Sequence, residues 1–403
     1  MQRKSNHYWR INGYLCAVIY VAMDKSADGH HVSLFPLFAA VLLLSVSCGD
    51  RQSSYETVPW GSSTSDTSSV AAGLTLSDLQ TGGEMIMLTV SGPDTYYDYR
   101  GRGMGVQFLL CERFAQSIGV GLRVELCRDT SEVVRRLKSG DGDVAVIMMT
   151  AEDIEAYGLL SCGVAVDSLA LSWAVAGGNV TLAEALDAWY EPRLLAAVRQ
   201  EINNAAGLAR KRTRVYATFV DRKGGVISRY DALFRRYAPE CRWDWRLLAA
   251  VCCQESAFDP RARSWAGACG LMQIMPATAA TLDLPMEHIF DPEANIAASV
   301  RYISRLNTTF SDITDATERR SFVLAAYNGG ADHVRDAMAL TRRQGGNERR
   351  WADVERRLLL LQEPRYYNDP VVKHGYMRAE ETVGYVSSIR RIYAQYRGVP
   401  SKQ

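Results

Sequence analysis

The stretch CCQESAFDPRARSWAGACGLMQIMP, residues 252–276, places one glutamate between an apolar segment and a loop of small residues. The apolar segment WDWRLLAAVCC predicts a helix, because apolar side chains recur along it at intervals of three and four residues. Glu255 continues this pattern, three residues after Cys252. We therefore expect its carboxyl group at the inward edge of a core-facing stripe formed by Trp245, Leu248, Ala249 and Cys252.

The expected position of Glu255 has a chemical consequence. Removal from water and the negative end of a helix dipole both disfavour a charged carboxylate. A carboxylic acid that keeps its proton near neutral pH is suited to act as a general acid. The stretch alone leaves an alternative open, in which Glu255 faces solvent at a fraying helix end.

The segments that follow add candidate binding residues. The loop GACGLMQIMP is rich in small and apolar residues and has few charges. Its backbone can therefore approach a bound polymer closely and present Met272 and Gln273 to it. The same loop could instead be a turn that packs into the core. In FVLAAYNGG, two glycines end a helix and place Tyr327 and Asn328 on its last turn, where side chains can point into a groove. The last predicted helix, ETVGYVSSIRRIYAQY, carries Tyr385.

The preceding part of the chain has a different pattern. Strands are predicted for EMIMLTV (84–90), GLRVELC (121–127) and residues 143–149, with amphipathic helices between them. This alternation indicates a parallel α/β unit. We expect a glycine-punctuated loop over residues 96–105 and one long amphipathic helix over residues 181–202. From residue 228 onward the chain is predicted to be almost entirely helical.

The first 80 residues have the features of a leader and a tether. The apolar run VSLFPLFAAVLLLSVSC, residues 32–48, has the length of the hydrophobic part of a signal peptide. Small residues precede Cys48, and a Ser/Thr-rich stretch follows it. This resembles a bacterial lipoprotein signal in which Cys48 becomes lipidated; a plain cleaved signal peptide or an anchor helix is the alternative. Met23 is a second possible start, because it leaves a signal peptide of ordinary length.

The composition limits the possible classes of protein. A formal net charge of +1 gives no indication of nucleic-acid binding. The nine cysteines show no zinc-type spacing, and we expect Cys111, Cys252 and Cys253 to be buried apolar residues. No metal or cofactor is predicted. A pair of glycines at 101 and 103 lacks the rest of a dinucleotide-binding motif, so that type of site is rejected.

The order of Tyr-Arg-Gly, helix, strand and Gly-Asp-Gly-Asp-Val over residues 84–200 resembles the first lobe of family-3 periplasmic solute-binding proteins. In that family an arginine follows the third strand in a Thr-x-Glu-Arg motif, whereas this chain reads TAEDIEAYGLL. The region that follows is also short. We therefore expect an abridged α/β domain and leave open whether it binds a ligand or serves as a scaffold.

Four short motifs appear in order in the helical part: Glu-Ser at 255–256, Gly-Leu-Met-Gln at 270–273, Ala-Tyr-Asn at 326–328 and Tyr-Val at 385–386. Together they resemble the lytic transglycosylase domain, which has a goose-lysozyme-like fold, across residues 228–400. The whole chain resembles the membrane-bound lytic murein transglycosylase F family. The fold class implied is an α/β domain followed by an all-α lysozyme-like domain, in four segments: leader 1–48, tether 49–80, solute-binding-like domain 81–222 and transglycosylase domain 223–403.

The resemblance also implies an activity. Glu255 would be the single catalytic acid and base that cleaves the bond between N-acetylmuramic acid and N-acetylglucosamine and forms a 1,6-anhydro product. Tyr327 would form a hydrogen bond near Glu255 or to the 2-acetamido group. A hydrolysing muramidase and a non-catalytic peptidoglycan- or muropeptide-sensing lipoprotein remain alternatives. The residues implied to line the glycan groove are Ser256, Met272, Gln273, Tyr327, Asn328 and Tyr385.

The implied partners are peptidoglycan glycan strands, a muropeptide at the N-terminal domain, and a membrane reached through the lipid on Cys48. The implied location is the periplasmic side of the cell envelope, at the outer membrane. His333, directly after the Tyr-Asn-Gly-Gly turn, is either a further site residue or a packing residue at a helix start.

Overall fold

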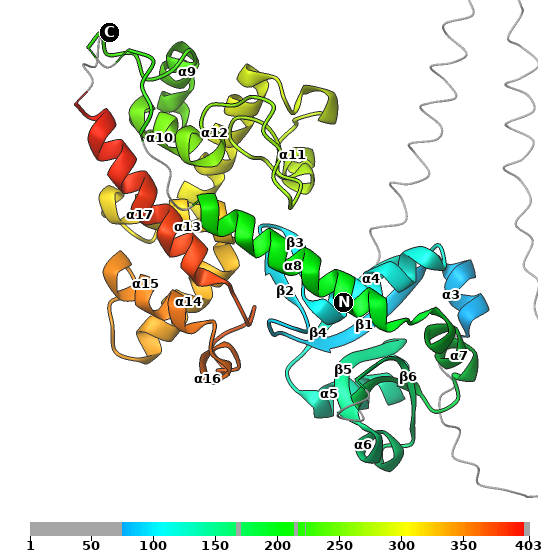
Figure 1. Cartoon of the computed structure of the whole chain (residues 1–403). Coiled ribbons are helices and arrows are strands. Elements are labelled where there is room, and N and C mark those ends of the chain that lie inside the picture. Colours follow the sequence, from blue (N-terminus) through cyan, green and yellow to red (C-terminus); the bar gives the residue numbers. More distant parts are fainter. Residues whose placement is uncertain (1–74, 167–170, 213–216, 222, 399–403) are drawn as a thin grey trace, which may run out of the picture. The chain divides into compact units, whose positions relative to one another are not determined.

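In the computed structural model, a sheet with flanking helices is followed along the chain by a set of helices (Figure 1). The structure describes residues 75–166, 171–212, 217–221 and 223–398. Cys48 and the rest of the predicted leader lie outside these residues. The described residues belong to one compact unit. The predicted order, an α/β region and then an all-helical region, is confirmed, whereas the boundary at 222/223 stays a prediction.

The central sheet has five strands in the order β4-β1-β5-β7-β6. Strand β1 pairs in parallel with both β4 and β5, which confirms the predicted parallel unit. Strand β7 runs antiparallel to β5, and β6 runs antiparallel to β7, so the complete sheet is mixed. The strands are β1 (Glu84–Val90), β4 (Gly121–Cys127), β5 (Val144–Thr150), β6 (Leu159–Val166) and β7 (Leu171–Ala176).

Helices cover both faces of this sheet, because its central strands are apolar on both sides. On one face, Met85 and Met87 of β1 share a buried cluster with Phe114 of α4. On the other face, Leu88 packs in a cluster with Val133 of α5. The helices of this region are α3 (Leu76–Gly82), α4 (Val106–Ser117), α5 (Thr130–Lys138), α6 (Ala151–Ala156), α7 (Val180–Trp189) and α8 (Pro192–Arg212).

Two expectations for the α/β region are wrong. The long helix expected over 181–202 is divided into α7 and α8, because Pro192 restricts the residue before it and itself opens the second helix. The loop expected over 96–105 contains a two-stranded hairpin, β2 (Tyr97–Tyr99) and β3 (Arg102–Met104). Its turn residues, Arg100 and Gly101, both have positive φ, 55° and 77°, as a type I′ turn requires.

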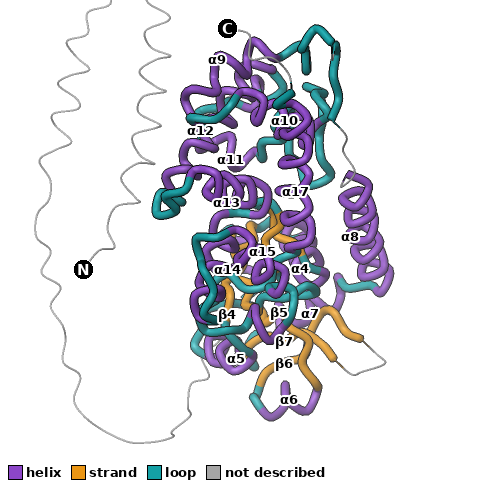
Figure 2. Tube along the Cα trace, turned by 90° about the vertical axis from the view of Figure 1, so that its left-hand side faces the viewer, coloured by secondary structure: helices purple, strands orange, loops and turns teal. Residues whose placement is uncertain are grey.

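The helical region is built around α10, whose residues from Leu247 to Glu255 are all buried. Helix α10 packs against α9 and α17. Within the described ranges, no helix is long and apolar enough to cross a membrane. The elements are α9 (Asp231–Cys241), α10 (Trp245–Ser256), α11 (Pro276–Thr281), η1 (Met286–His288), α12 (Pro292–Thr309), α13 (Ala316–Gly329), α14 (Ala331–Arg343), α15 (Trp351–Leu360), α16 (Pro364–Tyr367) and α17 (Ala379–Tyr396). Figure 2 shows α10 and α17 from a second direction.

The cysteines named in the sequence analysis behave as expected. Cys111, Cys252 and Cys253 are fully buried and free of disulfides. Burial raises the pKa of the Cys252 thiol, so this group stays protonated. These cysteines therefore act as small apolar residues of the core.

A fully buried asparagine of α12, Asn295, fixes the loop that carries the Gly-Leu-Met-Gln motif. Its Oδ1 accepts a hydrogen bond from the Met272 amide at 2.8 Å, and its Nδ2 donates to the carbonyl oxygens of Ile289 at 2.8 Å and Cys269 at 3.2 Å. Gly270 has φ of 78°, and a Cβ there would overlap the Asn295 amide and the Ile289 carbonyl oxygen. The loop can therefore approach α12 this closely only with glycine at 270.

We predict that Asn295→Ala lowers the free energy of unfolding by about 3 kcal/mol, because buried backbone groups of the loop lose their partner. Chemical denaturation of the full chain measures this change. Asn307→Ala is the matched control on the same helix: Asn307 is half-buried and donates one hydrogen bond to Cys241 at 3.3 Å, so its loss should cost about 1 kcal/mol or less. Equal effects of the two substitutions would contradict the role of Asn295.

Candidate active site

Helix α10 delivers Glu255 to the base of a cavity. Asp244 caps the N-terminus of the helix, because its carboxylate accepts a hydrogen bond from the Arg246 amide. It ends at Ser256, because Ala257 and Phe258 take positive φ values of 52° and 65°. Glu255 is 5% exposed. Its predicted place at the inward edge of the apolar stripe is therefore confirmed.

Helix α17 supplies a hydrogen-bond donor to this carboxyl group. The Tyr385 hydroxyl donates to Glu255 Oε1 at 2.6 Å, and both side chains are buried. Burial, followed by the nearby negative charge of Glu255, raises the pKa of Tyr385 well above its usual value. Tyr385 therefore keeps its proton at all physiological pH values and remains a donor.

The β2–β3 hairpin places a cation beside the same carboxyl group. Burial is the largest single effect and disfavours the charged Arg100 guanidinium, but the negative charge of Glu255, added to smaller electrostatic contributions from other neighbours, raises the pKa of Arg100 above its usual value. Arg100 lies at the hairpin turn with φ of 55°, a conformation uncommon for residues other than glycine. Sequence reasoning missed this residue; the signal was Arg-Gly between two short segments, YDY and RGM.

Aromatic contacts hold the hairpin against the helical region. The Tyr99 hydroxyl donates to the Glu381 carboxylate on α17. The Tyr99 ring also stacks on Trp265, which lies between α10 and α11, with ring centroids 5.3 Å apart and planes 22° from parallel. The Arg378 guanidinium also lies over the Tyr99 ring, 5.7 Å from its centroid. The position of Arg100 is therefore fixed by its neighbour in the chain.

The end of α13 forms a second wall. The Tyr327 hydroxyl donates to the Met272 carbonyl oxygen at 2.7 Å. Burial and then the charge of Glu255 raise the pKa of Tyr327. Asn328 Oδ1 accepts from the Thr382 hydroxyl at 2.8 Å, whereas its buried Nδ2 has no hydrogen-bond partner in the described part of the chain.

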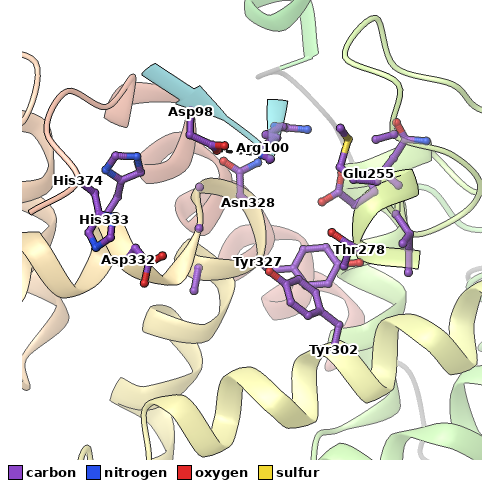
Figure 3. Close-up of a pocket in the computed structure, with 18 of the residues that line it drawn as sticks. Asp98, Arg100, Glu255, Thr278, Tyr302, Tyr327, Asn328, Asp332, His333 and His374 are labelled. Atoms are coloured by element: carbon purple, nitrogen blue, oxygen red, sulfur yellow. Dashed lines mark hydrogen bonds between the residues drawn. The ribbon is translucent and has the colours of Figure 1, made fainter. Parts of the chain in front are cut away.

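These residues surround a cavity of about 380 Å³ (Figure 3). Of the residues predicted to bind glycan, Gln273, Tyr327 and Asn328 line it together with Glu255. Gln273, at φ of 50°, donates its side-chain amide to the carbonyl oxygens of Gly270 at 2.9 Å and Ala262 at 3.1 Å. Gln273 therefore stabilises the loop through these hydrogen bonds and also forms part of the cavity wall.

The structure places the other three predicted binding residues outside the lining of this cavity. The Met272 side chain is fully buried in the core, and its backbone carbonyl is bound by Tyr327. The Ser256 hydroxyl donates back to the Cys252 carbonyl oxygen at 3.3 Å. Tyr385 reaches the site through its hydrogen bond to Glu255. Their assigned roles in binding stay predictions.

The far end of the cavity is polar. It is lined by Asp98 of the hairpin, by Asp332 and His333 at the start of α14, and by His374. In the view of Figure 3 these residues lie on the other side of Asn328 from Glu255. No group of three or more His, Cys, Asp or Glu side chains in the described residues could hold a metal ion.

The helical region that carries Glu255 and Tyr385 is similar in sequence to known proteins. Residues 232–349 match the family model described as "Transglycosylase SLT domain". The chain is also similar to membrane-bound lytic murein transglycosylase F of several bacteria, which confirms the resemblance predicted from the four motifs.

Three of these relatives show the extent of the similarity. The Photobacterium profundum protein is 36% identical over 186 residues, 46% of this chain and 34% of the relative. The Serratia proteamaculans protein is 41% identical over 174 residues, 43% and 35% of the two chains. The Klebsiella pneumoniae protein is 40% identical over 186 residues, 46% and 35%. The matched part thus spans about a third of each relative's length.

Solved structures give weaker likenesses. The 70 kDa soluble lytic transglycosylase of Escherichia coli is 28% identical, over 42% of this chain and 24% of that chain, with a TM-score of 0.31. Domain 1 of TmArgBP in its arginine-bound form is 17% identical, over 30% and 97% of the two chains, with a TM-score of 0.25. At these TM-scores neither likeness adds to the argument.

We predict an energetic coupling between Arg100 and Glu255. Arg100→Ala and Glu255→Gln each leave the other group without its counter-charge. The double variant should therefore lose about 1–3 kcal/mol less free energy of unfolding than the two single variants lose in total. Urea denaturation of the four proteins measures this coupling. Arg102→Ala, on the same hairpin, is the matched control and should combine additively with Glu255→Gln to within about 0.5 kcal/mol.

Proposed function

We propose that this chain is a peptidoglycan lytic transglycosylase that cleaves the β-1,4 bond between N-acetylmuramic acid and N-acetylglucosamine. The observation that carries the proposal is the buried Glu255 carboxyl group, which lines a cavity and accepts a hydrogen bond from Tyr385. The names of the sequence relatives support the same reaction. No step requires a metal or cofactor in this scheme.

In the proposed reaction, Glu255 donates its proton to the glycosidic oxygen as the bond from that oxygen to muramyl C1 breaks. The muramyl 6-hydroxyl oxygen then bonds to C1 and gives its proton to Glu255, which forms the 1,6-anhydro ring and restores the acid. Tyr385 stabilises the carboxylate between the two transfers, since its hydroxyl donates to Oε1. Gln273, Tyr327 and Asn328 would contact the glycan.

The alternative of a hydrolysing muramidase is less well supported. Glycosidases that use water generally carry a second carboxylate beside the acid. Asp259, four residues after Glu255, is exposed, accepts a hydrogen bond from the Arg261 amide and does not line the cavity. An internal nucleophile from the sugar removes the need for that second group. A purely sensing lipoprotein would have no use for a buried acid with its own donor.

The proposal extends to the location of the chain. Relatives named as membrane-bound support a place in the cell envelope. The lipid anchor on Cys48, the outer membrane, and a muropeptide at the N-terminal domain come from the sequence alone and are proposed on that basis. Mass analysis of the mature N-terminus tests the lipid on Cys48, and an unmodified cysteine would rule it out.

The reaction is tested by mass spectrometry of sugars released from purified peptidoglycan. We expect anhydromuropeptides from the unaltered chain and a loss on the order of 10²–10⁴-fold in Glu255→Gln, because the general acid is gone. Glu287→Gln, an exposed glutamate on η1, is the matched control and should release normal amounts. Reducing-end products would indicate a muramidase, and no release from the unaltered chain would favour a binding protein.

The role of Tyr385 is tested separately. Tyr385→Phe should lower kcat about 10–100-fold, because a hydrogen bond to a charged group is worth about 1.5–3 kcal/mol. Tyr393→Phe is the matched control on α17, since the Tyr393 hydroxyl donates to Asp244 at 3.1 Å, away from Glu255. Equal kcat values for the two variants would contradict the proposed stabilisation of the Glu255 carboxylate.

A further inference from the structure

Tyrosines from α12, α13 and α17 lie at or next to the cavity, and their hydroxyl groups are engaged differently. The Tyr385 hydroxyl donates to Glu255 Oε1 at 2.6 Å. The Tyr327 hydroxyl donates to the Met272 carbonyl oxygen at 2.7 Å. The Tyr302 hydroxyl forms no hydrogen bond with any residue that the structure describes. Two of these hydroxyl groups are thus used within the protein, and the third is not.

Tyr302 has a defined place on the cavity wall. It belongs to α12 and lines the cavity together with Glu255 and Tyr327. Its ring contacts that of Tyr327, with ring centroids 5.4 Å apart and planes at 48°. In Figure 3 the two rings lie together beside Thr278, on the same side of the view as Glu255 and away from His333. Because the Tyr327 hydroxyl is itself bound to a backbone carbonyl, this contact holds the Tyr302 ring against a fixed neighbour.

The hydroxyl group of Tyr302 is accessible. Tyr302 is half-buried, and its oxygen is not among the enclosed polar atoms that lack a partner, so this oxygen keeps contact with solvent. Burial, and then the negative charges of Asp98 and Asp332 on the lining of the same cavity, raise the pKa of Tyr302. The hydroxyl therefore stays protonated near pH 7, and it can both donate and accept a hydrogen bond.

This arrangement has the chemistry of a contact to a sugar. The hydroxyl of a largely buried tyrosine usually has a partner in the protein, and Tyr302 is an exception. Ligand cavities combine apolar and aromatic walls with a few polar groups that fix the orientation of the ligand. A saccharide presents C–H groups, which can lie against an aromatic ring, together with hydroxyl and acetamido groups, which can bond to a phenol.

We propose that Tyr302 is a substrate-binding residue whose hydroxyl forms a hydrogen bond with a hydroxyl or acetamido group of an N-acetylhexosamine unit. The inference rests on the proposed function, because it assigns this contact to the glycan bound beside Glu255. It divides the tyrosines by role: Tyr385 serves Glu255, Tyr327 fixes the loop that carries Met272, and Tyr302 bonds to the sugar. The hydrogen bond to the sugar that the family resemblance implied for Tyr327 is thereby assigned to Tyr302.

The test is isothermal titration calorimetry with the full chain carrying Glu255→Gln, so that glycan is not consumed. The probes are a tetramer of β-1,4-linked N-acetylglucosamine and peptide-free glycan strands. Addition of Tyr302→Phe removes only the hydroxyl and should weaken binding about three- to tenfold, the effect of one neutral hydrogen bond. A loss with both probes places the contact on a group that both sugars carry, and a loss with the strands alone places it on the muramyl unit.

Two further tyrosine variants serve as controls. Tyr237→Phe removes a hydroxyl that donates to Glu293 of α12 at 2.8 Å, outside the lining of the cavity, so binding should not change. Tyr327→Phe removes a hydrogen bond within the protein, and its melting temperature should fall by about 2 °C or more. Tyr302→Phe should keep its melting temperature to within about 1 °C, because the lost hydroxyl has no partner in the described residues.

Three outcomes would overturn the proposal. One is unchanged binding of both probes after Tyr302→Phe. Another is a fall in the melting temperature of Tyr302→Phe as large as that of Tyr327→Phe, because it would show that the Tyr302 hydroxyl serves the fold. The third is that neither probe binds the Glu255→Gln chain, since the cavity would then hold no saccharide site.

Failure of the proposed reaction gives a different result. A chain that releases no anhydromuropeptides, but binds either probe less tightly after Tyr302→Phe, retains the contact and loses the reaction. A chain that releases anhydromuropeptides with the same KM before and after Tyr302→Phe, and binds both probes equally, retains the reaction and loses the contact.

Discussion

A carboxyl group removed from water needs partners, and the structure around Glu255 is arranged to supply them. Tyr385 on α17 donates a hydrogen bond to it, and Arg100 on the β2–β3 hairpin provides a positive charge. These three residues are far apart in the sequence, so α10, α17 and the hairpin must all be correctly placed before the site exists. The contacts of Tyr99 with Glu381 and Trp265 are what bring the hairpin to that position.

The loop that carries the Gly-Leu-Met-Gln motif, residues 270–273, is constrained by its close packing against α12. Asn295 satisfies the Met272 amide and leaves the Met272 carbonyl oxygen to Tyr327. The Gly-Leu-Met-Gln motif is therefore largely a structural device: its glycine permits the approach, its leucine and methionine are buried, and its glutamine both holds the loop and lines the cavity. Gln273 is the member of the motif that lines the cavity in the described part of the chain.

Features that depend on local pattern could be predicted from the sequence. Strands β1 and β4 follow from apolar runs, and the burial of Glu255 follows from its spacing after Leu248 and Cys252. The hairpin was missed because its strands have three residues each, too short for an alternating pattern. The electrostatic influence of Glu255 on Arg100 could not be predicted, since only tertiary packing brings these two residues into the same region.

The position of the β2–β3 hairpin beside the helical region has a consequence for any shortened form of this chain. The segment recognised by the family model covers residues 232–349 and contains Glu255. It ends before Tyr385 and begins after Arg100, so a fragment cut to those limits would keep the acid and discard both groups that surround its charge. The segment that the family model covers and the set of residues around Glu255 therefore have different limits in this sequence.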